Sequence, residues 1–191
     1  GRGGPRQPVM GSVRGYYDSN TRRFLKLGRG GSTGAIHQPV WTPGTDSVER
    51  AIHVVDDLVL AEARELRAER ILDLGCGVGA SIAYLAERVA GRFFGITISG
   101  VQANLGAERL DALGLADRAT VVKGDFLSPA PYQTLLGPHK ADLAYAIESF
   151  VHSRSAAELF RAVRDRLRPG GHFCVCDDFL ARDPDGKKEE R

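Results

Sequence analysis

The chain has 191 residues, of which 42% are hydrophobic and 26% are charged, and its formal net charge is +2. This size and composition predict one soluble globular domain, and so small a charge does not indicate a nucleic-acid partner. No apolar run approaches the roughly 20 residues of a membrane-spanning helix, and the N-terminus lacks the apolar part of a signal peptide. Three cysteines, an odd number, imply no disulfide framework, so we expect a cytoplasmic protein whose thiols serve only in packing.

The first 45 residues show no regular hydrophobic periodicity. Residues 1–8 are rich in Gly, Pro and Arg, a composition typical of a flexible segment. Residues 16–43 mix aromatic and basic side chains with glycines, and we expect this stretch to act as a lid over a substrate. The chain is therefore divided into a flexible segment with the lid (1–45) and a core domain (46–191).

From residue 46 onward, predicted helices and strands alternate. The sequence Asp46-Ser47-Val48-Glu49 predicts a capped helix start. Apolar residues at helical spacing follow it from Val48 to Leu66. Strands are predicted at 70–75, 92–97, 119–124, 141–147 and 172–179, with helices ending near 88 and running from about 101 to 113.

The last two connections differ from each other. A loop rich in Pro and Gly follows the third strand. After the fourth strand, the capping pair Ser155 and Glu158 predicts a helix whose apolar face includes Phe160 and continues to Leu167. The helix is expected to end at Pro169-Gly170-Gly171.

The alternation predicts the α/β fold class, with a mostly parallel sheet and helices on both faces. In open sheets of this kind, ligands bind beyond the carboxyl ends of the strands. The candidate functional residues are therefore those that follow each strand.

The first strand runs directly into Asp73-Leu-Gly75-Cys-Gly77-Val-Gly79. The three glycines permit a tight turn and let the backbone approach a ligand closely. An acid just before them suits a positively charged ligand, such as the amino group of a methionine moiety, and would repel the pyrophosphate of a dinucleotide. The second strand also lacks the terminal acid that binds the ribose of NAD. Both features disfavour an NAD(P)-dependent oxidoreductase.

Residues 71–178 resemble class I S-adenosylmethionine-dependent methyltransferases, through ILDLGCGVG, Gly-Asp-Phe at 124–126 and LRPGGHF. The resemblance implies a Rossmann-like fold with S-adenosylmethionine bound by Asp73 and the glycine loop. It also implies that Asp125 accepts from the adenine amino group while Phe126 packs on the ring. The family normally adds a helix and an antiparallel strand pair after the fifth strand, so we expect a C-terminally truncated chain.

The segment GITIS-x-x-Q resembles the cyclopropane-fatty-acid synthase, tocopherol and sterol type of methyltransferase. That resemblance implies that Thr97 and Gln102 bind the cofactor, and we expect Ser99 between them to bind it too. A hydroxyl and an amide can each hydrogen-bond a ribose diol without a charge. The alternative is ordinary strand-end and helix-cap chemistry.

Glu148 follows the fourth strand, and His152 lies about one helical turn further on. Either side chain is suited to act as a general base there. The alternatives are that Glu148 only positions the next helix and that His152 only packs. IESFVHS resembles the corresponding segment of C-methyltransferases that act on sterols and prenyl diphosphates, which implies that Glu148 stabilises a carbocation and then removes a proton.

The aromatic and basic N-terminal stretch resembles the lid of bacterial geranyl- and farnesyl-diphosphate C-methyltransferases. That resemblance implies methylation of an alkene carbon of a prenyl diphosphate, with Mg²⁺ helping to neutralise the diphosphate. The alternative for the N-terminal stretch is a solvated basic loop. The alternatives for the function are small-molecule O- or N-methylation with His152 as the base, and a cofactor-binding module without catalysis. The acceptor and a homo-oligomeric state are left open. The predicted substrate-binding residues are Tyr16, Tyr17, Arg22, Arg29, His37, Trp41 and Phe150.

Overall fold

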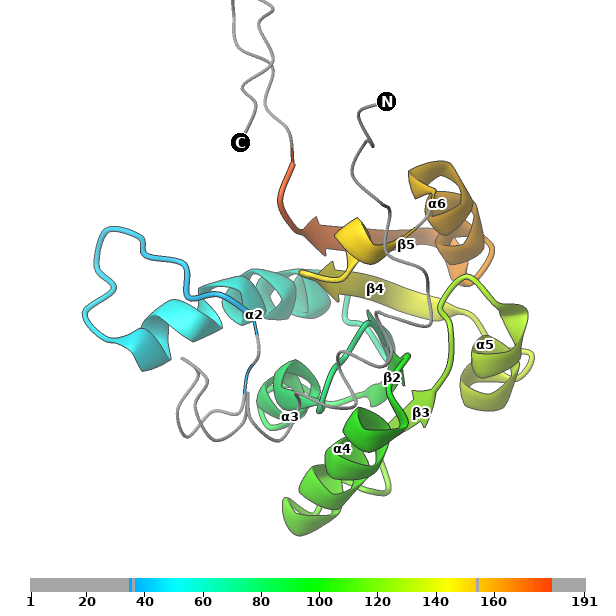
Figure 1. Cartoon of the computed structure of the whole chain (residues 1–191), viewed down its shortest axis with the longest axis horizontal. Coiled ribbons are helices and arrows are strands. Elements are labelled where there is room, and N and C mark those ends of the chain that lie inside the picture. Colours follow the sequence, from blue (N-terminus) through cyan, green and yellow to red (C-terminus); the bar gives the residue numbers. More distant parts are fainter. Residues whose placement is uncertain (1–34, 36, 154, 180–191) are drawn as a thin grey trace, which may run out of the picture.

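Five parallel strands form the centre of the structure (Figure 1), a computed structural model that describes residues 35, 37–153 and 155–179. The strand order is β3-β2-β1-β4-β5, and every neighbouring pair is parallel. This arrangement confirms the predicted α/β, Rossmann-like fold. The strands are β1 (Arg70–Leu74), β2 (Arg92–Thr97), β3 (Ala119–Lys123), β4 (Ala141–Ile147) and β5 (Leu167–Cys176).

Helices cover both faces of the sheet (Figure 1). Alternate strand residues divide between the two layers, so that Ile71 packs with the first helix layer and Leu72 with the second. Because both faces are buried, the strands carry continuous apolar runs. The first layer contains α2 (Val48–Glu65), α3 (Ala80–Ala86) and α4 (Gly100–Ala112), and the second contains α5 (Pro129–Leu136) and α6 (Ala156–Arg164).

The strand order reverses direction at β1 and β4. These strands are neighbours, with Asp73 paired in register with Tyr145. The chain leaves β1 toward α3 in one layer and leaves β4 toward α6 in the other. Such a switch point opens a crevice beyond the strand ends. It therefore brings the predicted cofactor loop and Glu148 to the same place.

Strands β2 and β4 occupy the predicted residues, whereas details of two helices differ. The N-cap of α2 is Ser47, whose Oγ accepts from Arg50 N at 3.3 Å. Val48 is 44% exposed and Phe160 is 51% exposed, so their predicted place on buried faces is wrong. The buried stripe of α6 consists of Leu159 and Val163, and Phe160 lies on its rim.

The connections on both sides of β4 correct two further predictions. Helix α5 occupies the segment expected to be a loop, with Pro129 in its first turn, where proline is well tolerated. Helix α6 ends at Arg164, so Leu167 begins β5 and Pro169-Gly170-Gly171 lies inside that strand. The register between β4 and β5 shifts at this point. This irregular part of a strand at the edge of the described sheet accommodates a proline.

Gly95 on β2 gives a testable prediction about the packing beneath the cofactor loop. A Cβ atom there would lie 2.7 Å from both Cys76 Sγ and Ile82 Cδ1, which are buried. We expect Gly95→Ala to lower the free energy of unfolding by about 1–3 kcal/mol, the usual cost of overpacking. Chemical denaturation measures the change.

Gly100→Ala is the matched control. Gly100 is the first residue of α4, and a Cβ atom there would meet only the flexible Lys123 side chain, at 3.5 Å. Alanine is favoured over glycine in helices, so this variant should be as stable as the wild type or more so. Equal stability of both variants would show that the space around Cys76 is not tightly filled.

Candidate active site

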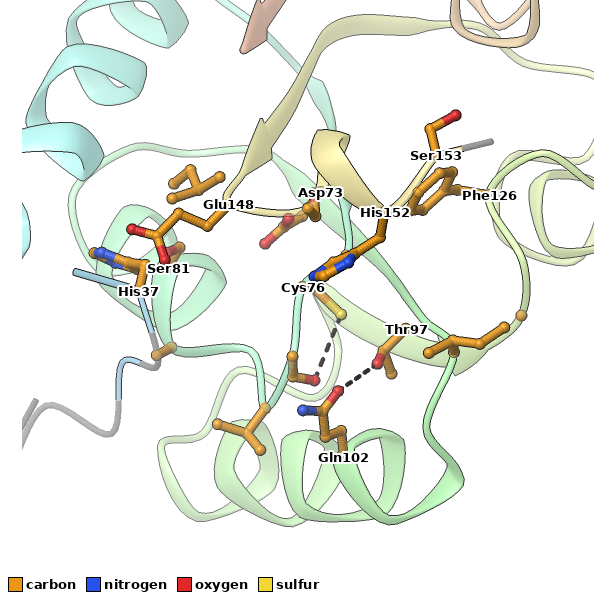
Figure 2. Close-up of a pocket in the computed structure, with 18 of the residues that line it drawn as sticks. His37, Asp73, Cys76, Ser81, Thr97, Gln102, Phe126, Glu148, His152 and Ser153 are labelled. Atoms are coloured by element: carbon orange, nitrogen blue, oxygen red, sulfur yellow. Dashed lines mark hydrogen bonds between the residues drawn. The ribbon is translucent and has the colours of Figure 1, made fainter. Parts of the chain in front are cut away.

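A hollow of about 1190 Å³, including its open mouth, lies beyond the carboxyl ends of β1, β2 and β4 (Figure 2). It collects residues from segments far apart in the sequence, as the switch point requires. The predicted site residues that line it are His37, Asp73, Gly75, Gly77, Thr97, Gln102, Asp125, Phe126, Glu148 and His152.

The glycine loop after β1 has the tight geometry that its sequence predicts. Gly75, Gly77 and Gly79 have φ angles of +87°, +53° and +70°, a region that favours glycine. A Cβ atom on Gly75 would lie 2.3 Å from Ser149 Cβ, so the loops after β1 and β4 are in direct contact. The Ser149 hydroxyl also donates to Leu74 O. Gly79 caps α3 and does not itself line the hollow.

Asp73 forms part of the inner wall and is only 4% exposed. Burial raises its pKa to about 8; the Tyr145 hydroxyl lowers it, and the charge of Asp56 raises it further. A carboxyl group in such a place favours a cation as its partner, because the attraction offsets the cost of burying the charge. The wall therefore fits the positively charged amino group of S-adenosylmethionine.

Thr97 and Gln102 form the side of the hollow beyond β2. They are 2% and 3% exposed, and Thr97 Oγ1 donates to Gln102 Oε1 at 2.7 Å. Ser99 instead caps α4, with its Oγ accepting from Gln102 N at 3.2 Å, and it is not part of the lining. The hydrogen bond orients the Gln102 amide, while direct contact of Ser99 with the cofactor stays a prediction.

Asp125 and Phe126 close the hollow on the side of β3. Asp125 Oδ1 accepts from Leu127 N at 2.8 Å, which fixes the turn. The Phe126 carbonyl accepts from the Tyr132 hydroxyl, so this loop is held from both directions. An acceptor beside an aromatic ring suits a purine, and this end of the hollow fits the adenine part of the cofactor.

Glu148 has an unusual backbone conformation at the end of β4. Its φ angle is +48°, which costs a residue with a Cβ atom about 1–2 kcal/mol and is characteristic of functional sites. Glu148 N donates to Cys176 O at 2.8 Å, and Glu148 Oε1 accepts from Gln38 N at 2.7 Å. Figure 2 shows the Glu148 carboxylate directed toward His37, whereas His152 lies on the side of Cys76.

Two predicted substrate residues that the structure describes, Trp41 and Phe150, are not brought to the hollow. Trp41 is 57% exposed and lies outside the lining. Phe150 also lies outside it and packs against Phe160 and Phe179, with ring centroids 5.6 and 5.9 Å away. The other predicted substrate residues, Tyr16, Tyr17, Arg22 and Arg29, lie outside the described residues.

Two residues that the motifs did not indicate contribute to the site. Gln38 acts through its main-chain N–H, so no side-chain pattern could have revealed it. Ser149 fills the space that Gly75 leaves; its position beside Glu148 in the sequence was the available signal.

Within the described ranges, no three His, Cys, Asp or Glu side chains are placed to hold a metal ion. These residues thus give the expected Mg²⁺ no support. None of the helices described is long and apolar enough to cross a membrane.

Comparison with known proteins agrees with this geometry. Residues 71–171, more than half of the chain, match the family described as "Methyltransferase domain". The chain belongs to the methyltransferase domain family. The fold and the cofactor side of the hollow agree with the class I, S-adenosylmethionine-dependent type of this family.

Curated relatives differ in the reactions that their names give. The chain is 29% identical over 86% of its length to Methyltransferase GfsG of Streptomyces halstedii. It is 29% identical over 94% to an O-methyltransferase of Pyrenophora dematioidea and 29% identical over 72% to sterol 4-C-methyltransferase strm-1 of Caenorhabditis elegans. It spans 57%, 66% and 38% of these proteins, respectively.

Solved structures support the fold. The [4+2]-cyclase SpnF superimposes with a TM-score of 0.75 at 29% identity, covering 91% of this chain and 61% of SpnF. Geranyl diphosphate methyltransferase, solved with geranyl diphosphate and sinefungin, gives a TM-score of 0.71 at 20% identity, covering 90% and 66%.

The buried Asp73 predicts that cofactor binding releases a proton. Because burial raises the pKa of Asp73 to about 8, the free protein holds this proton at about pH 6.5. The cofactor's amino group is charged at that pH, with an ordinary pKa of about 7.7–8.0, and its binding favours the ionised carboxylate. We expect close to one proton released per S-adenosylmethionine bound, measured by calorimetry in buffers of different ionisation enthalpy.

Asp73→Asn is the corresponding control, since an amide has no such proton to lose. The variant should release none and should bind the cofactor at least about tenfold more weakly, as expected for loss of a charged partner. An unchanged affinity would show that Asp73 does not hold the cationic end.

Proposed function

We propose that this methyltransferase transfers a methyl group from S-adenosylmethionine to an alkene carbon of an isoprenoid. Glu148 then stabilises the resulting carbocation and removes a proton from it. The observation that carries the proposal is the Glu148 carboxylate, held at the end of β4 in a left-handed conformation and lining the same hollow as Asp73. A fixed negative charge at that place suits a reaction in which positive charge develops on the substrate.

The comparisons are compatible with an isoprenoid acceptor. One relative is named as a sterol 4-C-methyltransferase, and one structural neighbour is geranyl diphosphate methyltransferase. We extend the proposal to a prenyl diphosphate, whose diphosphate would be recognised by the basic N-terminal residues around Arg22 and Arg29, outside the described part of the chain. In that case Mg²⁺ would be bound mainly by the substrate's phosphates and water.

Charge and atoms balance in the proposed reaction. When bound between Asp73 and Phe126, the cofactor supplies an electrophilic methyl group on a positively charged sulfur. The alkene's π electrons form the new carbon–carbon bond as the carbon–sulfur bond breaks, which leaves a positive charge on the neighbouring alkene carbon. Glu148 faces this charge and takes a proton from an adjacent carbon, and the electrons of that C–H bond form a new double bond.

The main-chain N–H of Gln38 makes the two carboxylate oxygens of Glu148 different, because it donates a hydrogen bond to only one of them. Oε1 accepts from Gln38 N at 2.7 Å, which leaves Oε2 as the oxygen that receives the proton. The segment carrying this N–H is itself held, because Val40 N donates to Ala51 O of α2 at 2.9 Å. The carboxylate is therefore fixed from β4 and from the N-terminal segment.

Small-molecule O- or N-methylation is the second candidate. His152 lines the hollow and could remove the proton of a hydroxyl or amine. Relatives named as O-methyltransferases are compatible with this reaction. A nucleophile with a lone pair needs a base but no stabilisation of a carbocation, so the two candidates differ in their dependence on Glu148.

Glu148→Gln separates the two candidates. The substitution keeps the size of the side chain and removes its charge and its capacity to take a proton. For C-methylation we expect kcat to fall by at least about 10²-fold, the scale of losing a general base, with cofactor affinity retained. The assay uses labelled S-adenosylmethionine with geranyl, farnesyl and geranylgeranyl diphosphates and a set of phenols and amines, with products identified by mass.

His152→Gln is the matched comparison in the same assay. Label found only in ether or amine products, with activity lost in His152→Gln but not in Glu148→Gln, would refute the C-methylation proposal. A product formed without an added methyl group would refute both candidates.

The Gln38 contact gives a separate prediction. Gln38→Pro removes the N–H that Glu148 Oε1 accepts from, whereas Gln38→Ala keeps it. We expect the proline variant to lower kcat about tenfold, on the scale of one charge-assisted hydrogen bond, and the alanine variant to retain it. Cofactor affinity should be the same in both. Equal activity of the two variants would show that this N–H does not position the carboxylate.

A further inference from the structure

Asp56 is a buried acid that the cofactor motifs do not include. It lies on α2, is 1% exposed, and belongs to the helix face that packs on the sheet. Its Oδ2 lies 2.7 Å from His53 Nδ1 and 4.0 Å from His37 Nε2, while its Oδ1 is buried without a hydrogen-bond partner. A buried carboxylate normally has its oxygens paired, so the unpaired one needs an explanation.

Two other buried polar atoms of this region make no hydrogen bond of normal geometry. They are the hydroxyl of Tyr145, which pairs in register with Asp73, is 1% exposed and lowers the pKa of Asp73, and Nε2 of His37. Asp73 and Tyr145 lie on neighbouring strands at paired positions, and their side chains point to the face that α2 covers. His37 and Asp73 line the hollow, whereas Asp56 and Tyr145 are buried and are not part of its lining. These four residues are called the inner polar cluster.

We propose that Asp56 is a second acid of the cofactor site, acting with Tyr145 to position Asp73 and adding negative charge behind the cofactor's amino-acid end. It is a positioning residue, because it is not part of the lining of the hollow. The inference concerns the cofactor end only and holds whichever acceptor is methylated.

The physical reason is the charge of the ligand. Two acids close together in a buried place repel each other when both are ionised. A cation placed against Asp73 compensates both negative charges, so binding is stronger than one acid alone would give. Tyr145 responds to both acids. Burial is the largest cause of its raised pKa, and the charges of Asp73 and Asp56 raise that pKa further.

Several titratable groups face the inner polar cluster and can contribute to the pH dependence of cofactor binding. They are His53 from α2, Cys76 from the glycine loop, and Glu148 after β4, whose carboxylate is directed toward His37 of the cluster (Figure 2). Burial and the charge of Asp73 raise the pKa of Cys76 well above its usual range, so this thiol stays neutral. Asp57, next in sequence to Asp56, is exposed and accepts from the Tyr84 hydroxyl at 2.7 Å.

Asp56→Asn tests the proposal, with Asp57→Asn as its matched control. At about pH 8 we expect Asp56→Asn to weaken binding of S-adenosylmethionine about tenfold. S-adenosylhomocysteine should lose the same factor, because the two ligands share the amino-acid end and differ at sulfur. At about pH 6.5 the variant should also release less than the wild-type number of protons on binding. Asp57→Asn should leave both quantities unchanged; titration calorimetry measures them.

A purely structural role would give a different pattern. Thermal unfolding reports whether Asp56→Asn folds; a lower Tm with unchanged affinity and proton release overturns the proposal. A loss confined to S-adenosylmethionine also overturns it, because the effect would then lie at sulfur. If Asp56→Asn fails to fold, Tyr145→Phe is the test. Binding of both ligands weakened by about threefold would support the proposal that Asp56 and Tyr145 position Asp73. Wild-type affinity would refute it.

Discussion

A buried carboxyl group at the end of the central strand is the constraint on which the rest of this site depends. Asp73 is 4% exposed among apolar strands, a place where an ionised acid is costly unless a cation accompanies it. A positively charged cofactor supplies that cation. The sheet places this acid next to the glycine loop, where the backbone lets a ligand approach closely. The free-energy cost of burying the Asp73 carboxylate without a cation therefore contributes to the affinity for a positively charged ligand.

The contact between Gly75 and Ser149 holds the glycine loop beside the end of β4. Gly75 leaves the space that Ser149 fills, so the loops after β1 and β4 are fixed relative to each other. Glu148 directly precedes Ser149 in the chain and has a left-handed conformation. Because Ser149 follows Glu148 directly, this contact fixes the glycine loop next to the residue that we propose to face the acceptor. Positioning of this kind can supply a large part of an enzyme's rate acceleration.

Much of the fold followed from local patterns, because strand–helix alternation and glycine turns depend on nearby residues. The predicted residues of β2 and β4 were correct. The Pro169-Gly170-Gly171 segment was misread because its place in β5 depends on pairing with β4, which the local sequence does not contain. Phe160 was assigned to the buried face of α6 by spacing alone, yet only Leu159 and Val163 of that helix are buried. Helix α5 was missed because Pro and Gly dominate its surroundings.

The site was predictable where function rests on side chains at strand ends, since parallel strands bring those ends together. Asp73, Thr97 and Asp125 are far apart in the sequence and meet at one edge. Gln38 was not predictable, because its contribution is a main-chain N–H made across the fold. Asp56 carried a signal: it lies on the apolar face of α2, where an acid is rare unless it has a partner. A polar residue inside an amphipathic stripe is therefore worth the same attention as a motif.

The choice between the two candidate reactions turns on how the two bases are held. Glu148 is fixed through its main chain to Cys176 O and through its carboxylate to Gln38 N. His152 is an exposed residue at the end of a single 3₁₀ turn, Phe150–His152. Stabilising a developing cation requires a charge oriented before the reaction begins, whereas deprotonating a hydroxyl requires only that a base reach it. Holding a carboxylate from two distant segments, at the cost of a strained backbone, has a clear use in the first reaction and little in the second.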